Sequence, residues 1–108
     1  MARRNSLFEF DLFLPKFTNS GKRIPASFWE SLRRTLTQAF GGVTEMRYRN
    51  IGRWKMGSFV YVDELVIFRV LTSKTLRSQK LIHDLKNELR KKLSQQEILV
   101  VRRDVLLS

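Results

Sequence analysis

The sequence contains no cysteine and only one histidine among its 108 residues. The absence of cysteine excludes disulfides, thiolate catalysis and sulfur-ligated metals, and it is typical of a cytosolic chain. A single histidine excludes a histidine-rich metal site and any mechanism that needs two histidines. Glycine signatures of the Walker and dinucleotide-binding types are also missing, as is a nucleophilic serine flanked by glycines. We therefore expect a non-enzymatic protein without catalytic residues or a cofactor.

Long apolar runs are missing as well. No segment approaches the ~18 consecutive apolar residues that a membrane-spanning helix needs. The first residues, which include Arg3 and Arg4, lead into alternating charge and not into the apolar segment of a signal peptide. We therefore expect a soluble, cytoplasmic protein that has no membrane partner.

Acidic residues are scarce compared with basic ones. The chain holds 21 Lys and Arg against 10 Asp and Glu, which gives a formal net charge of +11. Apolar residues nevertheless make up 43% of the chain, which is enough to build a core and argues against intrinsic disorder. The positive charge is concentrated in segments 44–58 and 74–96, whereas segment 59–73 is slightly acidic. Such a balance indicates a polyanionic partner.

Alternation of apolar and polar residues predicts the strands. Phe8, Phe10 and Leu12 lie two residues apart with acidic residues between them, which is typical of a half-buried strand. A later segment is partly apolar on both faces, which favours a central strand. The predicted strands cover 7–14, 44–48, 59–71, which is the central one, and 97–101 with an extension toward 106, while 50–58 is interpreted as a loop.

Two other segments show helical spacing. Ser27 and Glu30 have the spacing of a capping box just after Pro25, and the pair Gly41 and Gly42 provides a stop. Between these signals apolar residues recur every three or four positions, at Phe28, Leu32, Leu36, Ala39 and Phe40. A second helix is predicted over 73–94, with Ile82, Leu85, Leu89 and Leu93 on one side and many Lys and Arg on the other.

The predicted order is therefore strand, helix, strand, strand, helix, strand. This order contains two strand-helix-strand units. With right-handed crossovers, the two units form a four-stranded antiparallel sheet with two helices on one face, which is the ferredoxin-like βαββαβ arrangement of the α+β class. We expect a single ferredoxin-like domain over 1–108, with a flexible N-terminus over 1–6.

One face of such a sheet has no helices on it, and in this sequence that face carries more apolar surface than monomers usually expose. We expect this face, or an edge strand, to form an interface between two copies, so that the protein is a homodimer. The candidate interface residues are Phe13, Phe59, Tyr61, Leu65 and Ile67.

The basic segments provide the first functional hypothesis, which is binding of DNA or RNA through phosphates. In segment 44–58 cationic residues alternate with rings that can stack on bases, and in segment 74–96 basic residues outnumber acidic ones. The alternative is that these residues form the solvated sides of an edge strand and of a helix. The candidate nucleic-acid-binding residues are Arg47, Arg49, Arg53, Trp54, Lys55, Lys86, Arg90, Lys91 and Lys92.

Two further hypotheses stay open at this point. The protein could be an interaction or assembly module whose open sheet face binds itself or an acidic partner. It could instead be a metal-dependent nuclease, if Asp11 and Asp63 face each other on adjacent strands and hold Mg²⁺ through carboxylate oxygens. The alternative for these carboxylates is pairing with arginines of the sheet, such as Arg47, Arg49 or Arg69.

Several short motifs occur in an order and spacing that resemble a known family. They are Pro25 with Phe28-Trp29, Phe40-Gly41-Gly42-Val43-Thr44, Gly52-Arg53-Trp54, Tyr61-Val62-Asp63-Glu64 and Gln96-Glu97-Ile98-Leu99-Val100. Together they resemble an uncharacterised family of small bacterial proteins that are described only as hypothetical. The resemblance spans most of the chain. It implies a single ferredoxin-like domain and brings no established activity with it.

Overall fold

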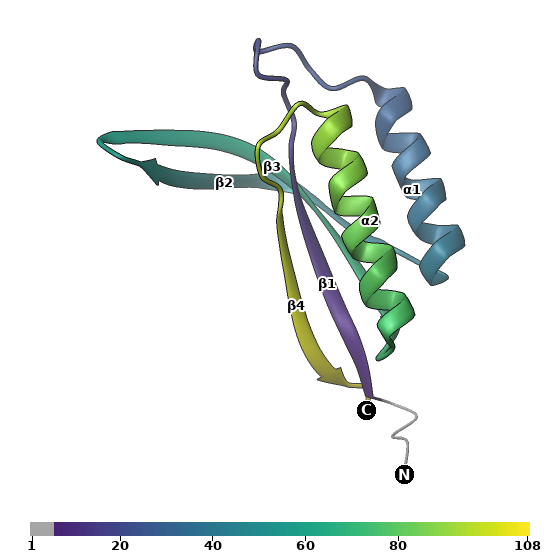
Figure 1. Ribbon diagram of the computed structural model, residues 1–108. Coiled ribbons are helices and arrows are strands. Elements are labelled where there is room, and N and C mark those ends of the chain that lie inside the picture. The colour runs from purple at the N-terminus through teal and green to yellow at the C-terminus, as the bar shows by residue number, and fades with distance from the viewer. Residues whose placement is uncertain (1–5) are drawn as a thin grey trace.

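The structure is a computed structural model that describes residues 6–108, except for the side chains of Tyr48, Arg49, Met56 and Tyr61. Within these residues the strands form one sheet in the order β2-β3-β1-β4, and each neighbouring pair is antiparallel. Both helices pack on the same face of the sheet (Figure 1). The elements are β1 (Ser6–Pro15), α1 (Ala26–Phe40), β2 (Thr44–Met56), β3 (Phe59–Ser73), α2 (Leu76–Lys92) and β4 (Leu99–Leu106).

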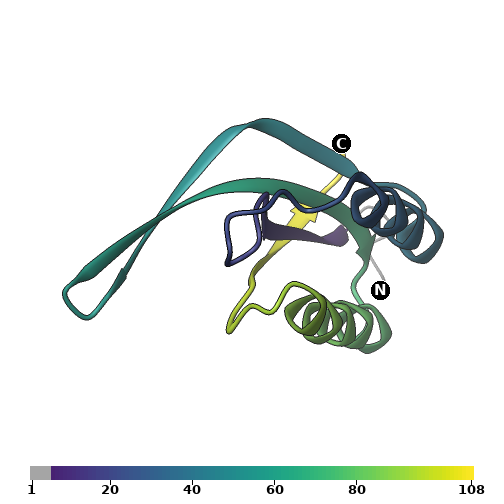
Figure 2. The same ribbon diagram turned by 90° about the horizontal axis from the view of Figure 1, so that it is seen from above.

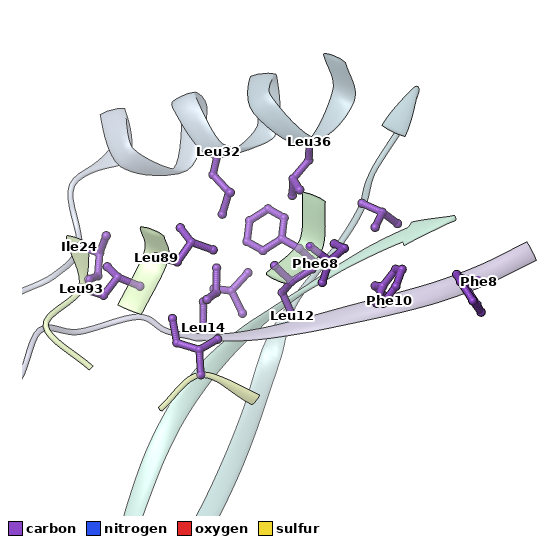
Figure 3. Close-up of a cluster of buried hydrophobic side chains, with 14 residues drawn as sticks. Phe8, Phe10, Leu12, Leu14, Ile24, Leu32, Leu36, Phe68, Leu89 and Leu93 are labelled. Atoms are coloured by element: carbon purple, nitrogen blue, oxygen red, sulfur yellow. The ribbon is translucent and has the colours of Figure 1, made fainter. Parts of the chain in front are cut away.

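The hydrophobic core lies between the sheet and the helices. Alternate residues of β1, from Phe8 to Leu14, are buried on the helix side, as the period of two predicts. Phe68 of β3 is fully buried below Leu32 and Leu36 of α1 (Figure 3). Full burial of each such side chain stabilises the folded state by about 1.5–3 kcal/mol. These contacts hold both helices on one face of the sheet and leave the opposite face open.

The helix ends follow local chemistry that the sequence only partly reveals. Ser27 lies inside α1, which begins at Ala26, so the predicted capping box does not form and Pro25 caps the helix without a side-chain hydrogen bond. Gly41 ends α1 with a φ of 81°, as its position predicts. The second helix begins later than predicted, because the Thr75 hydroxyl accepts a hydrogen bond from the backbone N–H of Ser78 at 3.1 Å.

The largest departure from the predicted structure is a long hairpin. β2 does not end at residue 48 but continues to Met56, with an irregular register between Met46 and Asn50. Gly57 then takes a positive φ of 61° in a tight turn, and β3 follows at once. The predicted loop over 50–58 is therefore wrong for all but its last residues. Gly57 lies in the turn of a hairpin, whereas Gly52 lies within β2 opposite Asp63, and the residues from Asn50 to Met56 form cross-strand pairs.

The end of this hairpin projects from the body of the protein. The last pair between β1 and β3 joins Pro15 to Leu65, so beyond it β3 pairs with β2 alone. We call residues 50–65 the arm. Figures 1 and 2 show the arm curling away from both helices. Strong twist is expected there, because two-stranded ribbons twist more than wide sheets do.

The arm corrects the prediction of a ferredoxin-like domain. That prediction had a short edge strand over 44–48, followed by a loop over 50–58, in a compact four-stranded sheet. The structure has instead a curled antiparallel sheet, two of whose strands continue beyond the layer of helices. The predicted flexible N-terminus lies outside the described residues except for Ser6, which is the first residue of β1. In residues 6–108 no helix has the length and apolar character needed to cross a membrane.

Candidate functional site

A groove of about 750 Å³ runs between α2 and the edge strand β4. Its floor is apolar and consists of Phe10 from β1, Ile82 from α2 and Val100 from β4. Its sides are formed by residues with more exposed and mostly polar side chains. These are Leu76, Gln79, Lys80, His83 and Lys86 on α2, and Arg102 on β4.

The helical side of the groove follows from residue spacing. Leu76, Lys80 and His83 are separated by four and three residues, and such positions lie above one another on one side of a helix. This row borders the stripe of α2 that packs on the core, to which Ile82 belongs. The groove therefore forms where the apolar stripe of the helix meets its cationic side.

The strand side of the groove carries one cation, Arg102, whose position is fixed by its neighbours. Val100 and Arg102 are two residues apart on β4 and so point to the same face of the sheet, the one that carries the helices. Arg102 pairs with Phe10 in the sheet register, and its guanidinium lies 4.7 Å from the centroid of the Phe8 ring. This cation–π contact holds the guanidinium beside the apolar floor. The carboxylate of Asp104 is 4.0 Å away.

The charges on the groove do not balance. Lys86 Nζ lies 2.8 Å from Glu97 Oε1, which also accepts a hydrogen bond from the backbone N–H of Ile98. These two hydrogen bonds, that of Lys86 first, lower the pKa of Glu97, so it is ionised at neutral pH and offsets the charge of Lys86. Lys80 makes no ion pair within residues 6–108. Asp104 lies 3.3 Å from Lys74 and 4.0 Å from Arg102, so its single charge is shared between these two cations. The groove therefore has a cationic excess, which Lys80 carries together with Arg102.

A second polar cluster lies on the open sheet face, the face turned away from the helices. Asp11 is only 2% exposed, and Arg69 donates two hydrogen bonds to its carboxylate, at 2.8 and 3.0 Å. Arg103 donates to Asp11 at 2.8 Å and to Glu9 at 3.3 Å, and Glu9 lies 3.1 Å from Arg69. Each carboxylate thus contacts both guanidiniums. The cluster joins β3, β1 and β4 and is electrically balanced.

The environment of Asp11 keeps it ionised. Burial raises the pKa of Asp11, but the hydrogen bonds from Arg69 and Arg103, with their positive charges, outweigh that effect. The pKa is therefore lower than the usual value for an aspartate. Because the pairing is complete, this cluster serves the sheet and is a poor candidate for ligand binding.

The predicted nucleic-acid-binding residues of segment 44–58 do not form a free basic surface. Arg47 pairs with Glu45, whose carboxylate also accepts two hydrogen bonds from Arg33 at 2.6 and 2.9 Å. The side chain of Arg49 lies outside the description. The remaining residues, Arg53, Trp54 and Lys55, are exposed on the arm, which projects away from α2 (Figures 1 and 2).

The predicted residues of α2 are partly neutralised. Lys92 Nζ lies 2.8 Å from the carboxylate of Glu88, one helical turn away, and Lys86 is paired as described above. Arg90 is half-buried and donates a long hydrogen bond of 3.4 Å to Asn87. Lys91 is exposed. The two predicted groups of cations therefore lie on separate parts of the molecule.

The predicted pair of metal-binding carboxylates is also separated. The sheet register places Asp11 opposite Arg69, whereas Asp63 lies opposite Gly52 on the arm. Asp63 precedes Arg69 by six residues on β3, which corresponds to about 20 Å of strand. The prediction that the two carboxylates face each other is wrong, and pairing with sheet arginines describes Asp11 correctly. Residues 6–108 contain no group of three or more His, Asp or Glu placed to hold a metal ion.

The predicted interface residues are spread along the open sheet face and the arm. Phe13 and Ile67 are half-buried neighbours on β1 and β3, and Phe59 is 68% exposed near the tip of the arm. Leu65 is 7% exposed, so it offers little surface. A Cβ on Gly52 would lie 3.0 Å from a methyl of Leu65, which shows how closely β2 approaches it. The side chain of Tyr61 lies outside the description.

The sequence alone does not predict the groove. The spacing of Leu76, Lys80 and His83 places them on one side of a helix, but such spacing is equally typical of a solvated helix face. The position of Arg102 beside this row depends on β4 pairing with β1 under α2, which is a tertiary arrangement. No short motif encodes it.

Comparison with known proteins gives a fold and no family. No protein-family model and no curated protein matches the sequence. Among solved structures, the chain is similar to a phage SAM lyase in complex with S-methyl-5'-thioadenosine, with a TM-score of 0.66 and 10% identity. The match covers 99% of this chain and 95% of the lyase chain. At this identity the likeness shows a shared fold alone. The resemblance to a family of small bacterial proteins stays a prediction.

These findings correct the nucleic-acid hypothesis. The fold is shared with a protein that was solved with a small molecule bound. Several of the predicted cations are neutralised by carboxylates, and the others are divided between the arm and α2. Net charge alone indicated a polyanionic partner, but the arrangement of that charge does not provide a phosphate-binding surface along which a nucleic acid could lie.

Proposed function

We propose that this protein binds a small molecule in the groove between α2 and β4. The observation that carries the proposal is an apolar floor beside two cations in one groove: Lys80, which makes no ion pair within residues 6–108, and Arg102, which shares Asp104 with Lys74. A volume of about 750 Å³ lies in the range typical of ligand sites in proteins. The fold shared with a lyase solved with S-methyl-5'-thioadenosine supports the choice of a small molecule as the ligand.

The chemistry of the groove selects the kind of ligand. A flat apolar ring fits against Phe10, Ile82 and Val100, whereas an anionic group fits near Lys80 and Arg102. A nucleoside monophosphate combines both features. S-adenosylmethionine carries positive sulfonium and ammonium groups, which the cationic excess of the groove disfavours. The preferred ligand is therefore expected to be more negative than S-adenosylmethionine.

Titration calorimetry at low salt tests this preference. Adenosine 5'-monophosphate is expected to bind at least tenfold more tightly than adenosine, because hydrogen bonds to charged groups contribute about 1.5–3 kcal/mol each. S-adenosylmethionine and S-methyl-5'-thioadenosine serve as the comparison ligands, and inorganic phosphate tests the anionic part alone. Equal affinity for adenosine and its monophosphate would contradict the assignment of an anionic ligand.

Matched variants locate the site. Lys80→Gln and Arg102→Gln are each expected to weaken binding of adenosine 5'-monophosphate about tenfold. Lys91→Gln is the control. Lys91 is an exposed lysine of α2 that does not line the groove, and it lies about 16 Å along the helix from Lys80. A loss of binding in all three variants to the same extent would indicate a nonspecific effect of net charge and would exclude the groove.

A further inference from the structure

The arm exposes large apolar side chains on both of its faces. Phe59 is 68% exposed, Val60 63% and Val62 59%, and β3 directs the first of these to the face opposite the second. Ile51 and Trp54 on β2 add to this surface. Exposed apolar patches of this kind usually mark an interaction site.

The arm also lacks the support that a hairpin normally needs. The base of the arm is tied to the body of the protein, because Leu65 pairs with Pro15 and the carbonyl of Glu64 accepts a hydrogen bond from the backbone N–H of Lys16 at 3.1 Å. From Ile51 to Asp63 the register pairs the two strands of the arm with each other. Figure 2 shows the arm away from both helices. An isolated two-stranded ribbon is marginally stable in water, and a third strand or a packing surface is needed to stabilise it. Something outside this single chain is therefore expected to cover the arm.

The open sheet face offers an apolar surface of its own. Leu71 of β3 is 39% exposed and Leu99 of β4 is 41% exposed. The sheet register places Phe13 and Ile67, both half-buried, in the same row as Leu99. Leu71 lies beside Glu9, on the other side of the row that holds Asp11 and Arg69. The arm and this face thus both expose apolar side chains of strands without a covering layer of helices.

Charge decides which partner fits these surfaces. On the arm, Arg53 and Lys55 are balanced by Asp63 and Glu64, and on the open face Arg69 and Arg103 are balanced by Glu9 and Asp11. The chain as a whole carries +11. Two copies therefore repel each other except where the meeting surfaces are neutral, as these are. An acidic partner would instead be attracted to the cationic surfaces elsewhere.

We propose that the arm of one copy packs on the open sheet face of a second copy, so that the protein is a homo-oligomer. The contact is heterologous, because the arm and the sheet face are different surfaces. Closure of the assembly requires each copy to donate its arm and to receive one. This proposal is independent of ligand binding in the groove.

Sedimentation velocity with complementary variants tests the proposal. The wild-type chain is expected to sediment as an oligomer of two or more 12.8 kDa chains at micromolar concentration. An arm variant, Val60→Thr with Val62→Thr, and a face variant, Leu71→Thr with Leu99→Thr, are each expected to weaken association at least tenfold. Threonine favours strands, so both variants are expected to fold. The control Leu81→Gln changes a leucine of matching exposure, 40%, on α2 and leaves association unchanged.

Mixing the two variants gives the sharpest result. An arm variant retains an intact face and a face variant retains an intact arm, so the mixture is expected to form a mixed pair with one arm-to-face contact. Recovery of association on mixing also shows that both variants are folded. A wild-type monomer at micromolar concentration would overturn the proposal. So would weakened variants that fail to associate on mixing although circular dichroism shows both to be folded.

Discussion

Asp11 is the residue through which three strands are joined. Its buried carboxylate accepts hydrogen bonds from Arg69 and Arg103. Asp11→Asn retains the shape of the side chain but removes its charge, and it is expected to lower the free energy of unfolding by about 2 kcal/mol. Urea unfolding at pH 7 measures this loss. Asp84→Asn is the control, because Asp84 is exposed on α2, and a loss of equal size there would contradict a special role for Asp11.

The same residue makes stability depend on pH. The pKa of Asp11 is lower in the folded chain than the value of about 3.9 expected when unfolded. Its contribution is therefore fully present above that value and is lost as the pH falls from about 4 through the folded pKa. Unfolding experiments between pH 5 and pH 2 are expected to show the wild type losing stability more steeply than Asp11→Asn. Parallel curves would contradict this assignment.

At the scale of elements, the end of α1 shows how one glycine differs from its neighbour. Gly41 adopts a φ of 81°, which L-residues rarely take, although there is open space around it. Gly41→Ala is expected to lower the free energy of unfolding by about 1 kcal/mol, because an L-residue is strained in the left-handed conformation. Gly42→Ala, where neither strain nor a close neighbour opposes a methyl group, is expected to have little effect. Thermal unfolding of both variants makes the comparison, and equal losses would contradict it.

The elements also show how far sequence reasoning reaches. The strand over Ser6–Pro15 and the end of α1 at Gly41 follow local patterns, and the sequence predicts them well. The arm could not be predicted, because Gly52 and Gly57 are typical of loops and only cross-strand pairing reveals the hairpin. The groove escaped prediction for a similar reason. Lys80 and Lys86 come from α2 and Arg102 from β4, and only the tertiary fold brings these two elements together.

At the scale of the whole molecule, the charge of +11 has opposite effects on the two proposed interactions. Association of two copies brings like charges together, so added salt is expected to strengthen it by screening their repulsion. Binding of an anion in the groove is expected to weaken with salt, because the same screening reduces its attraction to Lys80 and Arg102. Sedimentation and calorimetry between 50 mM and 500 mM salt measure both trends. A shift in the same direction for both would contradict this division of roles.

The central claim is that a small anionic molecule binds between α2 and β4. It is tested most directly by recording the amide spectrum of the ¹⁵N-labelled protein during titration with adenosine 5'-monophosphate. The expected result is a set of saturable shifts in residues 76–86 and 100–102, with the arm over 50–65 unchanged. Shifts centred on the arm or on the open sheet face, or no saturable shift at millimolar ligand, would contradict the claim.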